Sequence, residues 1–177
     1  MRRLMLALVT VLSIATTTNG EAADLENTLY IDLEHGRVVI EMLPGVAPKH
    51  VERIKELARE GFYDGVVFHR VIPGFMAQTG DPTGTGRGGS KKPDLPAEFS
   101  NTPFERGTVG MARSQNPNSA NSQFFIMFDQ GSFLNGQYTV WGQVTEGMEH
   151  VDAIATGEPP RNPDKMVTVQ VAADAKD

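Results

Sequence analysis

The sequence contains no cysteine among its 177 residues. This absence excludes disulfides, thiol catalysis and thiolate metal sites together. Histidine is scarce as well: the chain has 4, which lie far apart, and none has a second His or an acidic residue at a spacing typical of metal ligands. We therefore expect neither a metal nor a cofactor, and a fold that depends on its hydrophobic core for stability.

Basic charge is also in short supply. The 16 Lys and Arg residues face 22 acidic ones, which gives a net charge of −6, and the longest basic run is Lys91-Lys92. Because the neutralisation of phosphates requires a basic surface, the sequence argues against a dedicated nucleic-acid binder. It also lacks a nucleophile elbow and a local Ser/His/Asp signature, so hydrolysis has no candidate site.

No apolar run is long enough to span a bilayer. Arg2 and Arg3 precede an apolar stretch over residues 4–15, and small polar residues follow up to Ala23. That stretch is shorter than the roughly 20 residues of a membrane-spanning helix, and the pattern predicts a cleaved signal peptide over residues 1–22, with a retained anchor as the alternative. Cleavage after Ala22 is favoured over cleavage after Ala23, because it places small residues before the cut. Residues 23–177 then form one domain.

Short β-rich segments dominate the rest of the chain. Strands are predicted over residues 29–33, 37–42, 66–72, 75–78, 108–112, 123–128, 138–144 and 167–172, the first two joined as a hairpin. A helix is predicted from Pro48 to the stop at Gly61, with an apolar stripe on one face, and a second around residues 148–155. Because strands do not alternate with helices, we expect a mainly β protein with an antiparallel sheet closed into a barrel or sandwich, and a monomer without free sheet edges.

The glycine-rich segment GTGRGG at residues 84–89 matches the dinucleotide-binding fingerprint letter for letter. In that fingerprint the turn leads straight into a helix whose N-terminus holds the pyrophosphate. Here the residues that follow, SKKPDLP, cannot begin a long helix. We interpret the segment as a surface loop, and an oxidoreductase, which would rest on this motif alone, is the weakest reading.

Arg70 stands among apolar and amide side chains in the segment FHRVIPGFMAQ, residues 68–78. An Arg can donate hydrogen bonds at any physiological pH but cannot act as a base, so a site built on it would polarise or hold its ligand. The apolar residues of this and related segments could simply belong to the core. Arg70 and Gln78 argue against that alternative, because a buried Arg without a carboxylate is costly.

The segment at residues 68–78, together with SQFFI at residues 122–126, resembles the two signatures of the cyclophilins, the peptidyl-prolyl cis-trans isomerases. The resemblance runs from Thr28 to Val171 and is greatest to bacterial exported members. It implies a closed eight-stranded antiparallel β-barrel capped by two helices, with the substrate groove on its outer surface. It also implies a periplasmic enzyme that acts on proline-containing polypeptides and leaves the membrane once its signal is cleaved.

The resemblance assigns roles to particular residues. Arg70 corresponds to the catalytic arginine, and Gln78 to an amide that binds the substrate backbone or steers Arg70. The substrate-binding set also contains the main chain of Ala112 and Arg113, the second-signature residue Gln123, and the apolar pocket for the proline ring, Phe75, Met76, Phe125 and Leu134.

Two members of the substrate-binding set depart from the family pattern. Phe133 stands where many members have Trp, and Tyr138 where they have His. The loss of an indole N–H donor predicts weak cyclosporin binding while it preserves an apolar wall. Trp141 should not replace it, because a shift of three along a strand points to the other face.

The chemistry of proline isomerisation suits such a site. The partial double bond of an X–Pro amide gives a barrier of about 18–20 kcal/mol, and no bond needs to be broken. As the amide twists, its nitrogen recovers a lone pair to which Arg70 can donate. The rival from another class is a non-catalytic reader of proline peptides or a chaperone, which would have little use for a donor aimed at that nitrogen.

Overall fold

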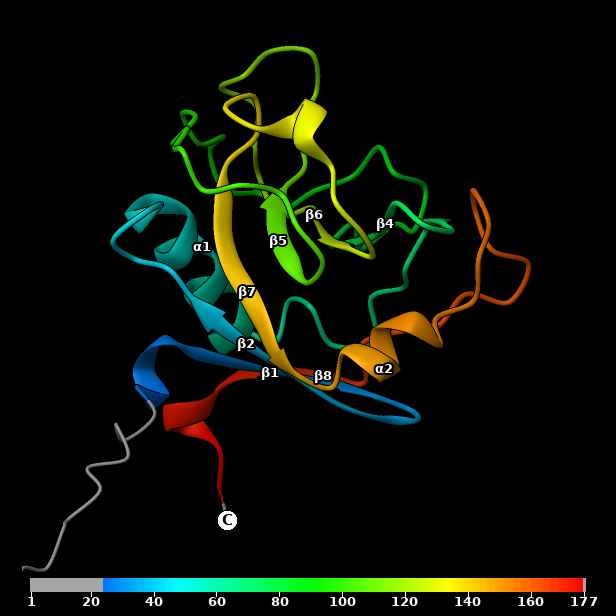
Figure 1. Cartoon of the computed structure of the whole chain (residues 1–177). Helices are drawn as coiled ribbons and strands as arrows, with labels where there is room; N and C mark the ends of the chain where they lie inside the picture. The colour runs from blue at the N-terminus through cyan, green and yellow to red at the C-terminus, as the bar shows by residue number, and fades with distance from the viewer. Residues whose placement is uncertain (1–23, 177) are drawn as a thin grey trace, which may run out of the picture.

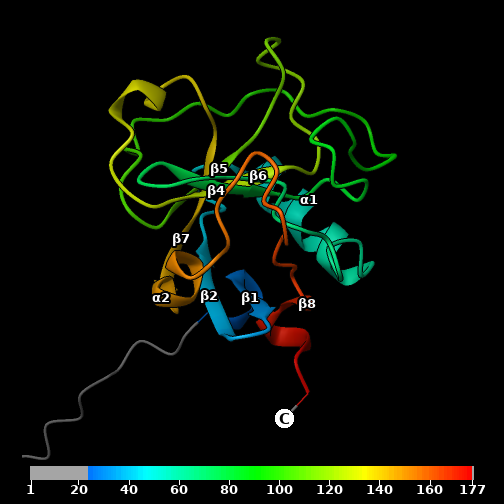
Figure 2. The ribbon, with the colours of Figure 1, turned by 90° about the vertical axis from the view of Figure 1, so that its right-hand side faces the viewer.

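The computed structural model describes residues 24–176, so the predicted signal peptide and its cleavage site lie outside the described residues. One antiparallel sheet of 8 strands, in the order β3-β4-β6-β5-β7-β2-β1-β8, curls around the main hydrophobic core (Figures 1 and 2). The strands are β1 Thr28–Leu33, β2 Gly36–Met42, β3 Arg70–Ile72, β4 Met76–Thr79, β5 Thr108–Met111, β6 Phe124–Met127, β7 Val140–Glu146 and β8 Thr168–Val171. In this part of the chain, no helix has the length and apolar character needed to cross a membrane.

The expected closed barrel is wrong, because the sheet is open between β3 and β8. Two isolated antiparallel bridges, Val67 with Lys165 and Val71 with Gly157, span the gap in place of a ladder. The segment that faces β3 carries prolines at 159, 160 and 163, which have no N–H to donate and cannot sustain a continuous ladder. The strand predicted over residues 66–72 is correspondingly shortened to Arg70–Ile72.

The predicted first hairpin and first helix are confirmed. β1 pairs with β2 from Thr28 opposite Glu41 to Leu33 opposite Gly36. The helix α1 spans Pro48–Arg59 and buries its apolar stripe, while α2 is limited to Met148–Asp152. Three short 3-10 helices complete the elements: η1 Leu25–Asn27, η2 Ser132–Leu134 and η3 Ala172–Asp174. The two α-helices lie apart from each other, α1 against β7 and β8 and α2 against β2, and both bury apolar residues in the main core (Figure 1).

A distant carboxylate caps the start of α1. The Glu98 carboxylate accepts hydrogen bonds from the backbone N–H groups of Lys49 and His50 at 3.2 and 3.1 Å. It also lies 2.6 Å from Nδ1 of the buried His50 ring, with which it forms a third hydrogen bond. Burial alone would raise the pKa of Glu98, but the hydrogen bonds from His50 and the two amides hold it below its ordinary value. These contacts attach the long loop that precedes β5 to α1. They also give a partner to two backbone N–H groups in the first turn of α1, which have none within the helix.

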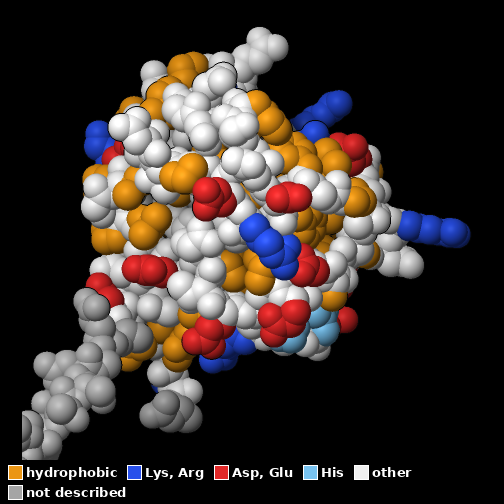
Figure 3. Space-filling view, viewed as in Figure 1, with side chains coloured by type: hydrophobic (Ala, Val, Ile, Leu, Met, Phe, Trp, Pro, Cys, Tyr) orange, Lys and Arg blue, Asp and Glu red, His pale blue; other side chains and the backbone are white. Residues whose placement is uncertain are grey.

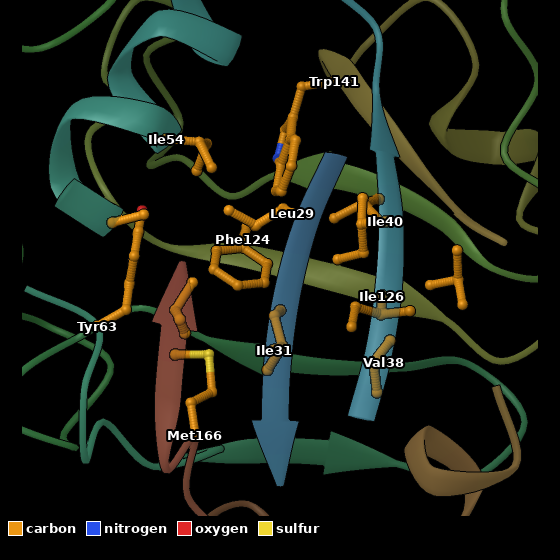
Figure 4. Close-up of a cluster of buried hydrophobic side chains, with 14 of the residues drawn as sticks. Leu29, Ile31, Val38, Ile40, Ile54, Tyr63, Phe124, Ile126, Trp141 and Met166 are labelled. Atoms are coloured by element: carbon orange, nitrogen blue, oxygen red, sulfur yellow. The ribbon is translucent and has the colours of Figure 1, made fainter. Parts of the chain in front are cut away.

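The sheet separates two apolar clusters. The main core fills its inner side and contains Phe124 and Ile126 of β6, with the Phe124 ring edge-on to Trp141 at 5.4 Å between centroids (Figure 4). A smaller cluster, which we call the outer cluster, lies on the other side and consists of Met76, Phe104, Phe125, Met127, Leu134 and Val140. Because side chains alternate along a strand, neighbouring residues of β6 serve different clusters.

The surface shows no concentration of one charge on the face viewed in Figure 3, where acidic and basic side chains are scattered between apolar patches. The ion pair between Arg106 and Asp152, with a distance of 2.6 Å, is typical of these exposed contacts. Such pairs contribute little to stability. The fold therefore depends on the two apolar clusters and the hydrogen bonds of the sheet.

Candidate active site

A cavity of about 290 Å³ opens above the outer cluster. Met76, Phe125 and Leu134 form its floor and are only 2, 5 and 7% exposed. All residues that line this cavity belong to the set predicted from the sequence: Arg70, Phe75, Met76, Gln78, Ala112, Arg113, Phe125, Leu134 and Tyr138. An apolar floor with charged and amide groups at one side is suited to a small apolar ring attached to a polar backbone.

Aromatic packing holds the floor in place. The Phe125 ring is stacked on Phe104 with 5.7 Å between centroids, and it meets the edge of Tyr138 at 5.9 Å. The two stacked rings stand above Gly110 of β5, where a Cβ atom would come within 2.6 Å of both. Gly110 therefore leaves the space that lets the rings form a flat, rigid floor.

Arg70 forms one wall of the cavity. It begins β3 and lies opposite Gln78 of β4, so both side chains project toward the same outer surface. The Arg70 side chain is 42% exposed, and its Nε atom donates to Oε1 of Glu158 at 2.7 Å. Within residues 24–176, neither Nη nitrogen of Arg70 has a hydrogen-bond partner. Two charged donors are thus available to a ligand in the cavity.

Gln78 connects this wall to the glycine-rich loop. Its Nε2 atom donates to Oε1 of Gln123 at 2.9 Å, and Nε2 of Gln123 donates to the carbonyls of Gly86 and Gly88 at 3.1 and 2.8 Å. These amide assignments give every contact a donor and an acceptor. The hydrogen bonds hold Gln78 beside Arg70, and place Gln123 behind the cavity wall.

The loop itself is organised around Asp81, whose carboxylate is buried. Asp81 accepts the backbone N–H groups of Thr83, Thr85 and Gly88 and both threonine hydroxyls, at distances from 2.7 to 3.3 Å. Burial alone would raise the pKa of Asp81, but the bonds from Gly88 and Thr83 outweigh it and hold the pKa far below its usual range. The loop amides that would hold a phosphate in a dinucleotide site are thus directed at the chain's own carboxylate.

A second, more polar cavity of about 500 Å³ adjoins the first and shares Gln78, Ala112 and Arg113 with it. Gln123 lines this second cavity and not the first. The Ala112 N–H donates to Gln123 O at 2.9 Å, whereas the Ala112 carbonyl and the Arg113 N–H have no partner within the described residues. That free carbonyl and N–H are the groups an extended peptide would need in order to pair along the groove.

The Arg113 side chain has a local structural role. Its guanidinium lies 4.4 Å from the centroid of the Tyr138 ring, and its Nη2 donates to the carbonyl of Gln137 at 2.7 Å. The charge therefore orients the Tyr138 ring at the cavity wall. This arrangement is compatible with the expectation that Arg113 meets a substrate through its backbone.

Phe133 does not line the cavity as a wall. Its side chain is 63% exposed and lies outside the lining, and its ring centroid is 5.5 Å from that of the lining residue Phe75. Phe133 ends up at the rim because it lies in η2, where the chain turns over the cavity, and Leu134 takes the inward position. Trp141 is fully buried in the main core, as its spacing predicts.

Metal ligands do not cluster in this site or elsewhere in residues 24–176: no group of three or more His, Asp or Glu side chains could hold an ion. His69 is buried beside the glycine loop, and burial lowers its pKa.

Nearly all of the described domain matches a known family. The family model described as "Cyclophilin type peptidyl-prolyl cis-trans isomerase/CLD" covers residues 28–172. The chain belongs to the cyclophilin family. Like other members of the family, this cyclophilin is a peptidyl-prolyl cis-trans isomerase.

Individual cyclophilins resemble it over most of their length. A Brucella suis protein named "Probable peptidyl-prolyl cis-trans isomerase" is 58% identical, covering 93% of this chain and 92% of its own. Peptidyl-prolyl cis-trans isomerase B of Bacillus subtilis is 42% identical over 74% of this chain and 92% of its own. The crystal structure of a cyclophilin from Hirschia baltica superposes with a TM-score of 0.80 at 30% identity, over 86% of this chain and 76% of its own.

Sequence patterns missed two carboxylates of this cyclophilin site. Glu158 is 88 positions from Arg70 in the chain, within the segment GEPP that has no strand or helix pattern. Asp81 lies next to the glycine-rich loop, and the signal that could have found it is the run of Thr and Gly after an acidic residue, which is typical of a carboxylate that accepts its own loop's amides.

Proposed function

We propose that this cyclophilin accelerates X–Pro bond rotation by placing the proline ring on the apolar floor and donating from Arg70 to the prolyl nitrogen of the twisted amide. The observation that carries this proposal is that Arg70 lines the same cavity as Phe125 and Leu134, while neither of its Nη groups has a partner among residues 24–176. Such a donor binds the twisted amide better than the planar one, whose nitrogen has no lone pair available.

The expected contribution of Arg70 follows from the strength of one charged hydrogen bond. Such a bond contributes about 1.5–3 kcal/mol, which corresponds to a rate factor of roughly 10 to 150. The rest of the acceleration then depends on the floor, which holds the ring while the preceding carbonyl swings. Partial exclusion of water over this floor strengthens the contact made by Arg70.

Proline-containing polypeptides are the proposed substrates, and two observations support this. A Cryptosporidium parvum cyclophilin, 28% identical with a TM-score of 0.76 over 81% of this chain and 98% of its own, was crystallised in the presence of the dipeptide Ala-Pro. In this chain, the free main-chain groups of Ala112 and Arg113 lie between the two cavities, so that an extended peptide can follow the proline ring along the groove.

The proposed setting is the periplasm, where the enzyme would act as a monomer on exported proteins whose folding waits for X–Pro isomerisation. This proposal rests on Arg2 and Arg3 followed by the apolar stretch at residues 4–15. Fractionation of cells that express the full chain, with the N-terminus of the product measured by mass spectrometry, tests it. A product that begins at Ala23 in the periplasmic fraction supports export, and an uncleaved cytoplasmic product refutes it.

Arg70→Ala tests the catalytic role. We expect kcat on a short X–Pro peptide to fall by about 10- to 150-fold, while the affinity measured by calorimetry changes little. The matched control is Arg106→Ala, which removes another exposed arginine paired with a carboxylate. Equal losses of rate and affinity would mean that Arg70 only binds, as a non-catalytic proline reader would require.

A further inference from the structure

We propose that Glu158 is a positioning residue that holds Arg70 in its working orientation. This inference rests on the catalytic role proposed for Arg70. The Oε1 atom of Glu158 accepts the Nε–H of Arg70 at 2.7 Å, and no other carboxylate makes an ion pair with Arg70 within residues 24–176. Glu158 lies outside both signature segments, residues 68–78 and 122–126, and neither the family description nor the resemblance assigns it a role.

The backbone around Glu158 is hydrogen-bonded to β3, the strand that begins with Arg70. Val71 and Gly157 exchange two hydrogen bonds, with N–O distances of 2.8 and 2.9 Å, next to Arg70 and Glu158 respectively. These bonds bring the 157–160 turn to the free edge of β3 at the opening of the sheet. The carboxylate therefore comes from a segment whose main chain is registered to Arg70 itself.

Gly157 is needed for this arrangement. Its φ angle is +145°, and a Cβ atom would lie 2.6 Å from Cα of Pro160 and 2.8 Å from the carbonyl oxygen of Pro159. A residue with a side chain would clash with the two prolines and open the turn. Gly157 therefore permits the tight turn from which Glu158 reaches the guanidinium.

The choice of Nε as the contact atom has a chemical consequence. A long, half-exposed Arg side chain samples many rotamers, and a charged bond at Nε restrains the plane of the guanidinium. The two Nη groups lie at the far end of that plane and remain free for the substrate. Glu158 thereby reduces the freedom that Arg70 must lose when the amide twists.

Substitutions of Glu158 should change turnover more than binding. We expect Glu158→Ala to lower kcat on a short X–Pro peptide by about three- to fivefold, in line with an exposed ion pair, with KM unchanged. Glu158→Gln keeps an oxygen acceptor without the charge and should restore part of the loss. Asp152→Ala is the control, because it removes a carboxylate from another exposed Arg pair without touching the cavity.

A double-mutant cycle separates this inference from the role of Arg70. If Glu158 acts through Arg70, Glu158→Ala lowers kcat in the wild-type background and has no effect in the Arg70→Ala background. An unchanged or faster Glu158→Ala enzyme, or an equal loss in both backgrounds, would overturn the positioning role. A fully active Arg70→Ala variant would instead refute the proposed function.

A spectroscopic measurement gives an independent outcome. In ¹⁵N-labelled protein, the Arg70 Nε–H resonance should exchange slowly with water in the wild type and rapidly in Glu158→Ala, while the resonance of Arg106 stays the same. Equal exchange of Arg70 Nε–H in the two proteins would mean that the pair does not form in solution, and the inference would fail.

Discussion

The buried carboxylate of Asp81 offers the sharpest test of how the glycine-rich loop is held. In Asp81→Asn the Oδ1 atom can still accept from Thr83, but an NH2 group replaces the oxygen that accepts the N–H groups of Thr85 and Gly88 at 3.1 and 3.0 Å. The N–H groups of Thr85 and Gly88 would then point at the NH2 group of the new Asn, which is itself a donor. The variant keeps the volume of the side chain, so the change is one of hydrogen bonding and charge alone.

The magnitude follows from these two lost acceptors. An unsatisfied buried donor costs about 1–3 kcal/mol, and because water can reach part of a surface loop, we expect a total of about 2–4 kcal/mol. With an m-value of about 2 kcal/mol/M, the midpoint of urea unfolding should fall by roughly 1–2 M. This is a large share of the stability of an ordinary domain.

The test is to compare the midpoint of urea unfolding of the wild type with those of Asp81→Asn and the control Asp129→Asn. Asp129 is exposed and accepts a single backbone N–H, so its substitution should change stability by less than about 0.5 kcal/mol. If Asp81→Asn is no less stable than Asp129→Asn, the loop does not depend on the carboxylate and the reasoning is wrong.

Three further predictions concern the floor, the rim and the acid stability. Phe125→Ala should destabilise the fold by about 3–5 kcal/mol in urea unfolding and weaken X–Pro peptide binding in calorimetry, because Phe125 forms the floor. Phe133→Trp should strengthen cyclosporin inhibition by restoring an N–H donor, with turnover unchanged since Phe133 is outside the lining; an unchanged inhibition constant would contradict this. Because folding lowers the pKa of Asp81, its stabilising effect is complete above the ordinary value of 3.8 and is lost as pH falls below it, so Asp81→Asn should unfold with a weaker pH dependence than wild type in acid titrations.

Local patterns were sufficient to predict most elements, whereas the residues that line the cavity were named by the family resemblance. Strand alternation predicted that Trp141 does not face the groove, and Trp141 is buried in the main core. The apolar stripe of α1 is buried as its 3.6-residue period indicates. Motif resemblance brought together Arg70 and Gln78, which face each other across β3 and β4. These features depend on residues near one another in the chain.

The errors concern contacts between distant segments. Barrel closure depends on whether β3 and β8 pair, and the prolines at 159, 160 and 163 interrupt that pairing from a segment with no strand pattern of its own. The partnership of Glu158 with Arg70 spans 88 positions and leaves no local signature. The position of Phe133 at the rim was also not visible in the sequence, because a motif aligns positions but does not show which of two neighbouring side chains in η2 points inward.

The outer cluster gives the substrate groove a foundation of its own. Phe125 and Met127 support the groove, while the residues that alternate with them along β6, Phe124 and Ile126, belong to the main core. A substitution on the groove side such as Phe125→Ala leaves the packing of the main core in place, but it removes stability that the outer cluster supplies. The range of peptides to which this enzyme can be adapted is therefore set by how much of that stability the domain can lose before it unfolds.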